Sequence, residues 1–162
     1  MNFIKLAFLS IAILFIIISS IGILLPSTVL VSRAVNVKAT KDAVLAYVNS
    51  IKQWSNWMDG MQQESVKISS STYADLAGTK VVINFISDSL IIATWTTKKG
   101  NAQISSMRII GGSLQKITVV QWQFEQKLKW YPWERLGSMM NDKIMGSMME
   151  KNLNNLKLLI EK

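Results

Sequence analysis

Apolar and polar side chains alternate without interruption along the segment Val120-Gln121-Trp122-Gln123-Phe124-Glu125. A period of two residues is typical of a β-strand with one dry face and one wet face. Working towards the N-terminus, further apolar runs occupy residues 80–87, 90–97 and 103–110, and a weaker strand is expected at 64–70. Short segments rich in Asp, Ser, Asn and Gly separate the runs and predict hairpin turns. We therefore expect an antiparallel meander whose dry face needs a cover.

The C-terminal residues 140–161 provide that cover, because their apolar side chains recur at helical spacing. Five of them share one face of the predicted helix: Met145, Met149, Leu153, Leu156 and Ile160. An amphipathic helix of this kind buries its apolar face against a partner. Upstream of the meander, residues 29–37 alternate like a strand, and residues 40–51 and 54–57 predict two short helices. The chain is thus predicted to have an α+β fold.

The order of strand, two short helices, curved antiparallel sheet and long C-terminal helix is the helix-grip arrangement. Two segments near its start carry a closer likeness, namely Val31-Ser32-Arg33-Ala34-Val35-Asn36-Val37 and Lys52-Gln53-Trp54-Ser55-Asn56-Trp57-Met58. Together with residues 43–48, 120–124 and 142–157, they resemble the START-like superfamily, which includes the polyketide cyclase/dehydrase-related proteins. The resemblance has no matching segment over residues 60–115. It implies an apolar cavity between sheet and C-terminal helix, and its members include lipid and hydrophobic-ligand carriers and cyclases.

The N-terminal residues 6–25 form an uncharged stretch in which fourteen of 20 side chains are Leu, Ile or Phe. About 20 residues of helix cross the hydrocarbon core of a bilayer, and Pro26 ends the helix because it lacks an N–H. A cleaved signal peptide is the alternative, but its apolar region usually runs about 7–15 residues. We expect a single-pass membrane protein with an anchor over residues 1–28 and a helix-grip domain over residues 29–162. The basic residues on both flanks leave open which side of the membrane the domain faces.

The chain contains no histidine and no cysteine. This composition excludes disulfides, thiol nucleophiles, histidine-dependent triads and histidine or thiolate metal sites. We therefore expect no cofactor and no metal, and we assign no catalytic residue. The net charge is +8, but the lysines are scattered, which favours a solvated surface over a nucleic-acid interface. Contact with anionic lipid headgroups is the second interpretation, and nothing in the sequence indicates an oligomeric state.

The candidate ligand contacts are side chains expected on the strands, on the short helices and on the C-terminal helix. They are Trp54, Trp57, Phe85, Trp122, Phe124, Met145, Met148 and Met149. Methionine fits irregular partners and tryptophan offers a broad apolar surface, yet both also fill ordinary cores, so core packing is the alternative. Arg108 joins them because an arginine inside an apolar strand lies on an exposed face or edge, or points at an acid or an anionic ligand.

Three functions fit these observations. The first is a membrane-tethered module that binds an apolar or amphipathic small molecule, or a lipid, between the sheet and the C-terminal helix. The second is a cyclase-type enzyme, because positioning a reactive chain needs few titratable groups. The third is a domain without a ligand that recognises another protein at the membrane. An interior filled by its own side chains favours the third.

Overall fold

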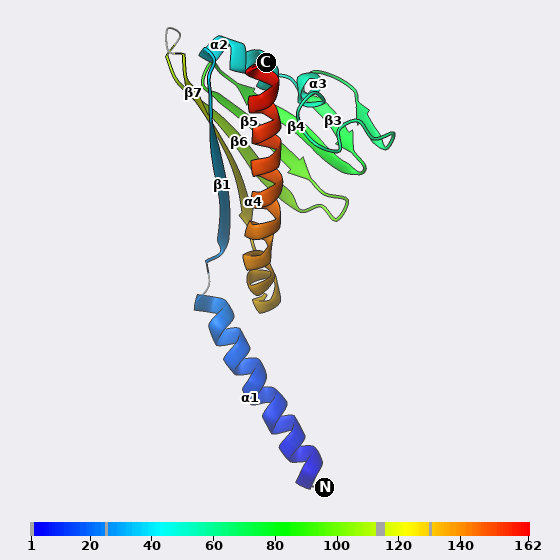
Figure 1. The fold of residues 1–162 in the computed structure, drawn as a ribbon. Helices are drawn as coiled ribbons and strands as arrows, with labels where there is room; N and C mark the ends of the chain where they lie inside the picture. The colour runs from blue at the N-terminus through cyan, green and yellow to red at the C-terminus, as the bar shows by residue number, and fades with distance from the viewer. Residues whose placement is uncertain (1, 25, 113–115, 130) are drawn as a thin grey trace.

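The computed structural model of the chain describes residues 2–24, 26–112, 116–129 and 131–162 (Figure 1). The described elements are, in chain order, α1 (Asn2–Leu24), β1 (Thr28–Val37), α2 (Lys41–Val48), α3 (Ile51–Trp54), β2 (Val66–Ile68), β3 (Tyr73–Leu76), β4 (Thr79–Ile86), β5 (Leu90–Thr96), β6 (Ala102–Ile110), β7 (Thr118–Lys127) and α4 (Pro132–Ile160).

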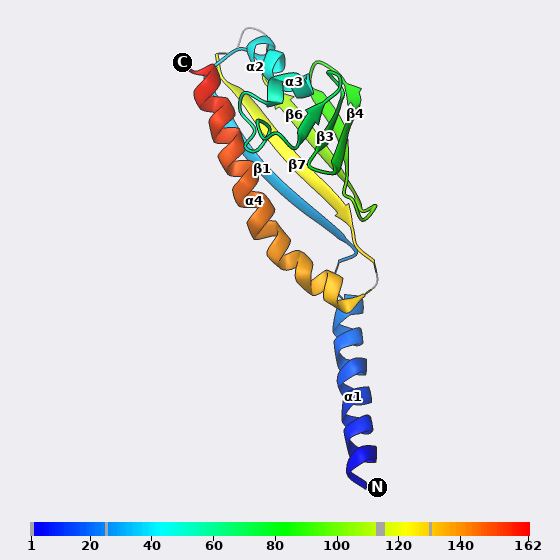
Figure 2. The same cartoon turned by 90° about the vertical axis from the view of Figure 1, so that its right-hand side faces the viewer.

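The strands form one antiparallel sheet in the order β1-β7-β6-β5-β4-β3-β2. From β2 to β7 each strand pairs with the next one in the chain, as a meander requires, and β1 closes the sheet by pairing with β7. Figures 1 and 2 show α4 lying across one face of the curved sheet, where it packs mainly on β1. The predicted α+β helix-grip fold is confirmed.

Two elements differ from the sequence prediction. The C-terminal helix begins at Pro132 rather than near residue 140, because a proline in the first turn of a helix loses no hydrogen bond. The prediction also omits β3, which is only four residues long. Its tight turn into β4 uses Ala77 at φ 54° and Gly78 at φ 96°, so the chain reverses without a longer polar segment to mark it.

The pairing register places the buried side chains on one face, called here the inner face. Trp122, Met107 and Ile91 form one row across β7, β6 and β5, and Phe124, Ser105 and Ala93 form the next row. All six are buried. Because α4 lies over this face, the inner face is the dry face that the alternation in β7 predicts.

Two predicted ligand contacts lie on the opposite, outer face. A β-bulge between Ile83 and Phe85 shifts the register of β4, so Phe85 pairs with Ile92 and is 49% exposed. Arg108 lies between the buried Met107 and Ile109 and is exposed. The expectation that Phe85 lines the space under α4 is wrong, because a shift of one residue in a strand exchanges its two faces. Arg108 lies on the outer face through the ordinary alternation of β6, which matches the exposed-face interpretation of this arginine.

Helix α1 projects from the domain at the end where α4 begins (Figure 1). Its 23 residues correspond to a length of about 35 Å. The window Phe3–Ser20 has a mean hydropathy of 2.5 and no buried residue. The helix is therefore long and apolar enough to cross a membrane, a property that signal sequences share.

Candidate functional site

The space between the inner face and α4 is filled at its centre by aromatic rings. The aromatic cluster consists of Trp54, Trp57, Trp95, Trp122 and Phe124. Its neighbouring ring centroids lie 5.3–6.5 Å apart, within the range that favours aromatic pairs. From α4, Met149 and Leu153 are buried in the same core. This part of the interior is therefore occupied by the protein's own side chains.

The indole N–H groups of the cluster distinguish one member from the others. Trp54 donates to the Val48 carbonyl at 2.8 Å, and Trp57 likewise donates to a backbone carbonyl. Trp122 donates to the Ser105 hydroxyl at 2.8 Å. The Nε1 atom of Trp95 is also buried but has no hydrogen-bond partner among the described residues. An unpaired buried donor costs about 1–3 kcal/mol. A ligand that supplies an acceptor to the Trp95 N–H would remove this cost.

Beside Trp95 the space opens into a groove of about 240 Å³. Its described lining residues come from α4, from the segment after α3 and from β2, β3 and β5, and they are Met58, Asp59, Gly60, Met61, Gln63, Val66, Leu76, Ala77, Trp95, Met148 and Asn152. The lining is mostly apolar. Small-molecule sites usually measure about 300–1,000 Å³, so this groove suits one alkyl chain or a small ring.

Polar side chains of α4 position the groove wall that follows α3. The Asn152 Oδ1 atom accepts the Asp59 N–H at 2.9 Å, and the Asn155 amide donates to Asp59 Oδ1 at 3.1 Å. Lys151 Nζ lies 2.7 Å from Asp59 Oδ2. The next residue, Gly60, turns the chain at φ 83°, a left-handed conformation that glycine adopts without steric cost. The wall therefore depends on α4 for its position.

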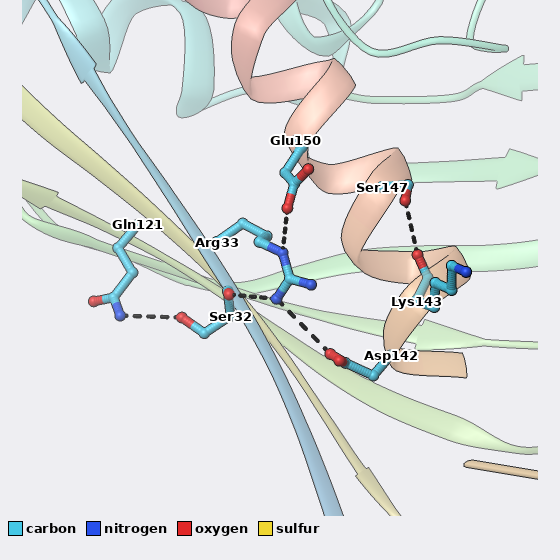
Figure 3. Close-up of polar contacts among 7 residues, drawn as sticks. All are labelled: Ser32, Arg33, Gln121, Asp142, Lys143, Ser147 and Glu150. Carbon is cyan, nitrogen blue, oxygen red and sulfur yellow. Dashed lines mark hydrogen bonds and ion pairs between the residues drawn. The ribbon is translucent and has the colours of Figure 1, made fainter. Parts of the chain in front are cut away.

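The opposite edge of α4 is joined to β1 through Arg33 (Figure 3). The Arg33 Nε–H donates to Glu150 Oε1 at 2.6 Å, and Arg33 Nη1 lies 3.8 Å from Asp142 Oδ1. Gly146 lies between these two acids on the helix, and a Cβ there would overlap the Arg33 guanidinium. Because this contact fixes the rotation of α4, the edge with Gly146 faces β1 and the edge with Met148 faces the groove.

The structure distributes the nine predicted ligand contacts over three places. Met148 lines the groove, and Phe85 and Arg108 lie on the outer face. The other six pack in or against the core, and they are Trp54, Trp57, Trp122, Phe124, Met145 and Met149. Their position matches the packing alternative, and a role for them in ligand contact stays a prediction.

Of the eleven described residues that line the groove, the sequence prediction names Met148 alone, and the largest apolar side chains that it missed are those of Met58, Met61 and Trp95. The signal for Trp95 is the alternation in β5, where Ile91, Ala93 and Trp95 fall on the inner face. Met58 and Met61 lie in an irregular segment without periodicity, so no pattern in the sequence marks the direction of their side chains.

Three larger hollows are found among the described residues: two of about 430 and 410 Å³, and one of about 480 Å³ beside Lys41, the β4–β5 turn and the end of β6. The first lies between the β5–β6 turn, the end of β7 and the start of α4, and the second lies around Ser55–Gln63 beside Asn155. Their linings are mostly polar, whereas small-molecule sites are mostly apolar. The smaller groove is therefore the candidate site.

The charged groups near the groove are already engaged with one another. Asp59 is the ionisable residue among the described lining, and it forms the contacts to Lys151 and Asn155 described above. A carboxyl with a lowered pKa lies elsewhere, at the β4–β5 turn. There, a hydrogen bond from Lys41 lowers the pKa of Asp88 below its ordinary value. The groove itself offers shape and apolar surface rather than an acid–base pair.

Comparison with known proteins shows similarity at the level of fold. No family profile and no curated protein matches the sequence. A START superfamily protein from Mycobacterium smegmatis superposes with a TM-score of 0.60 at 15% identity, covering 82% of this chain and 97% of that chain. A protein from Nitrosospira multiformis gives a TM-score of 0.61 at 12% identity, covering 80% and 94%. The di-domain ARO/CYC StfQ from the steffimycin biosynthetic pathway gives 0.58 at 10% identity, covering 83% of this chain and 51% of that chain.

These similarities confirm the START-like fold that the sequence predicts. The polyketide ARO/CYC proteins are among the structural neighbours, as the resemblance in the sequence implies. The coverage of 51% arises because StfQ has two domains and this chain matches about half its length.

Proposed function

We propose that this chain is a membrane-anchored helix-grip domain that holds the apolar part of one small amphipathic molecule in the groove beside α4. The observation that carries the proposal is a groove lined by Met58, Met61 and Met148 together with Trp95, whose buried N–H has no partner among the described residues. The START-like fold supports it, because the resemblance implies a ligand space between the sheet and the C-terminal helix.

The chemistry of the groove defines the class of ligand. Each buried methylene contributes about 0.8 kcal/mol, so six methylenes contribute roughly 5 kcal/mol before the cost of association. Methionine side chains adapt to different shapes, which favours broad selectivity for the apolar part. The Trp95 N–H adds one donor, and its partner would be an oxygen on the ligand. The expected ligand is an alkyl chain or small ring that carries a carboxyl, ester or carbonyl oxygen.

The anchor part of the proposal rests on α1. None of its apolar window is buried against the domain, and so large an apolar surface requires a non-aqueous environment. A bilayer supplies that environment for a helix of this length.

The proposal is tested with the full chain in phosphatidylcholine vesicles and a decanoic acid that carries a photoreactive diazirine in its chain. We expect saturable labelling of the peptides that contain Met58, Met61 and Trp95, displaced by excess decanoate. Met148→Asp places a charge on the groove wall and should reduce this labelling at least tenfold, since a charge is costly beside an apolar ligand. Leu158→Asp is the matched control, because Leu158 is a 56% exposed residue of α4 outside the groove.

The alternatives give different outcomes. If the Met148→Asp and Leu158→Asp variants are labelled equally strongly, the groove is excluded as the site. No saturable labelling at all would leave the domain without a ligand, and the filled aromatic cluster would then favour a protein-interaction role. A cyclase-type activity is the second candidate, favoured by the similarity to ARO/CYC proteins. To test this candidate, a reactive chain replaces the diazirine acid. A cyclase would release that chain as a chemically altered product.

A further inference from the structure

The middle of α4 carries an apolar ridge on its exposed surface. The ridge consists of Met140, Ile144 and Met148, whose exposed fractions are 70%, 67% and 41%. Side chains four residues apart on a helix are neighbours, so these three form a continuous strip of about 12 Å. The positions of α4 that face the sheet are occupied by other residues, including Met149 and Leu153. The ridge is therefore not the core-facing side of the helix.

Both ends of the ridge lie beside apolar features. At one end, Met148 is part of the groove wall. At the other end, α4 begins beside the C-terminal end of α1, and the two helices are in contact (Figures 1 and 2). Met140 lies eight positions after the first residue of α4, which is about 12 Å along the helix. If α1 crosses the bilayer, the ridge begins near the membrane surface and ends at the groove.

The Arg33 contact determines which way the ridge faces. Asp142 and Glu150 of α4 reach Arg33 on β1 (Figure 3). Gly146, between them in the sequence, also lies against the Arg33 guanidinium. Each ridge residue precedes one of these by two positions, which places it about 200° away around the helix. Figure 2 shows α4 tilted away from the axis of α1 towards the upper left, and the sheet lies on the right-hand side of α4 in this view. The surface of α4 away from the sheet is therefore turned towards the end of the molecule from which α1 projects.

We infer that the ridge of Met140, Ile144 and Met148 is the path by which an acyl chain passes from the membrane into the groove. The inference rests on the proposed binding function and assigns the source of the ligand, a lipid of the bilayer that holds α1. Its physical basis is that each methylene exposed to water during transfer slows the passage about fourfold. An apolar strip between bilayer and groove shortens that exposure, and its first two members, Met140 and Ile144, are not among the described lining residues of the groove.

The test separates the rate of entry from the extent of binding. Full-length protein in phosphatidylcholine vesicles is mixed with vesicles that carry the diazirine decanoic acid, and it is irradiated at increasing delays. The double variant Met140→Gln with Ile144→Gln keeps helix propensity and leaves Met148 in place. We expect the groove to label about tenfold more slowly and to the same final level, because two apolar contacts are lost on the path alone. The control double variant is Leu158→Gln with Ile110→Gln, two exposed apolar residues away from the ridge, and its rate should not change.

Three results would overturn the inference. The first is an entry rate equal to that of the unmodified protein. The second is a lower final level at an unchanged rate, which would make the ridge part of the binding site. The third is an unchanged rate together with loss of self-association, measured by cross-linking, which would assign the ridge to contact with a second copy. Absence of saturable labelling in the unmodified protein would instead remove the proposed function, so the two failures are distinguishable.

Discussion

The aromatic cluster and the groove occupy the same layer between sheet and helix, yet they differ in the exposure of their side chains and in the hydrogen bonding of their indole N–H groups. In the cluster, Trp54 and Trp122 are fully buried and their N–H groups have partners. In the groove, Met148 is 41% exposed and the N–H of Trp95 has no described partner. Trp95 is the boundary, because it stacks on Trp54 at 6.2 Å and also lines the groove. The helix-grip space is thus divided into a part that stabilises the fold and a part that remains open.

This division explains why the strongest apolar signals in the sequence do not mark the candidate groove. Large aromatic residues contribute most when they are completely enclosed, and close packing leaves no room for a ligand. The open part is lined instead by methionines and by one edge of a tryptophan. The comparison predicts that equivalent substitutions on the two sides of the boundary have unequal effects.

The largest difference is expected between Trp122→Phe and Trp95→Phe. Trp122→Phe leaves a void and removes the partner of the buried Ser105 hydroxyl, so it should lower the free energy of unfolding by about 2–4 kcal/mol. Trp95→Phe removes a donor that has no described partner, and the relief offsets lost packing, so its cost should be within about 1 kcal/mol. Urea unfolding of the full chain in detergent micelles, followed by circular dichroism, measures both. Equal costs would show that Trp95 belongs to the closed core.

The next effect compares the two edges of α4 through Gly146→Ala and Gly137→Ala. Alanine is favoured over glycine in a helix by about 1 kcal/mol, and a Cβ at Gly137 meets no atom of the described residues within 4 Å. Gly137→Ala should therefore stabilise the protein by about that amount. At Gly146 the Cβ displaces the Arg33 guanidinium and weakens its contacts with Asp142 and Glu150, which are partly exposed pairs worth up to about 1 kcal/mol each.

The expected gap between the two alanine variants is about 1–2 kcal/mol in the free energy of unfolding. The same urea experiment measures it. Two variants of equal stability would mean that Arg33 relocates without loss and does not fix the rotation of α4. The inference about the direction of the ridge would then lose its structural basis.

The sequence predicts the fold well because the fold depends on regular periods. The alternation in residues 120–125 corresponds to β7, and the spacing of Met145, Met149 and Leu153 corresponds to the buried face of α4. Phe85 shows the limit of this method. A β-bulge consists of one unpaired residue, and nothing in the alternation of β4 marks where the extra residue falls.

The candidate site is predicted less completely because it depends on irregular structure. Met148 is among the predicted contacts and lines the groove, but Met58 and Met61 reach the groove through a turn at Gly60 and a hydrogen bond that Asn152 on α4 accepts from the Asp59 N–H. Such contacts join segments that are about ninety residues apart in the chain, and no local pattern encodes them. The unpaired N–H of Trp95 is likewise a property of three-dimensional packing.

The smallest expected effect concerns the Lys41–Asp88 pair, which lies away from the groove and provides a control for the comparison. Lys41 Nζ lies 3.0 Å from Asp88 Oδ2 and joins the start of α2 to the β4–β5 turn. The hydrogen bond from Lys41 lowers the pKa of Asp88 below its ordinary value of 3.8.

A carboxyl with a lowered pKa in the folded state stabilises the protein above its unfolded pKa and loses that contribution as the pH falls through the folded value. Thermal unfolding of the unmodified chain and of Asp88→Asn should therefore differ slightly near pH 6 and converge below about pH 4. Lys41→Met breaks the same pair, so its stability should differ from that of the unmodified chain by the same small amount near pH 6. Labelling of the groove should stay unchanged in both variants. Stability curves that remain parallel down to the acid limit would show that the pair contributes nothing, and a change in groove labelling would show that the closed and open parts of the molecule are coupled.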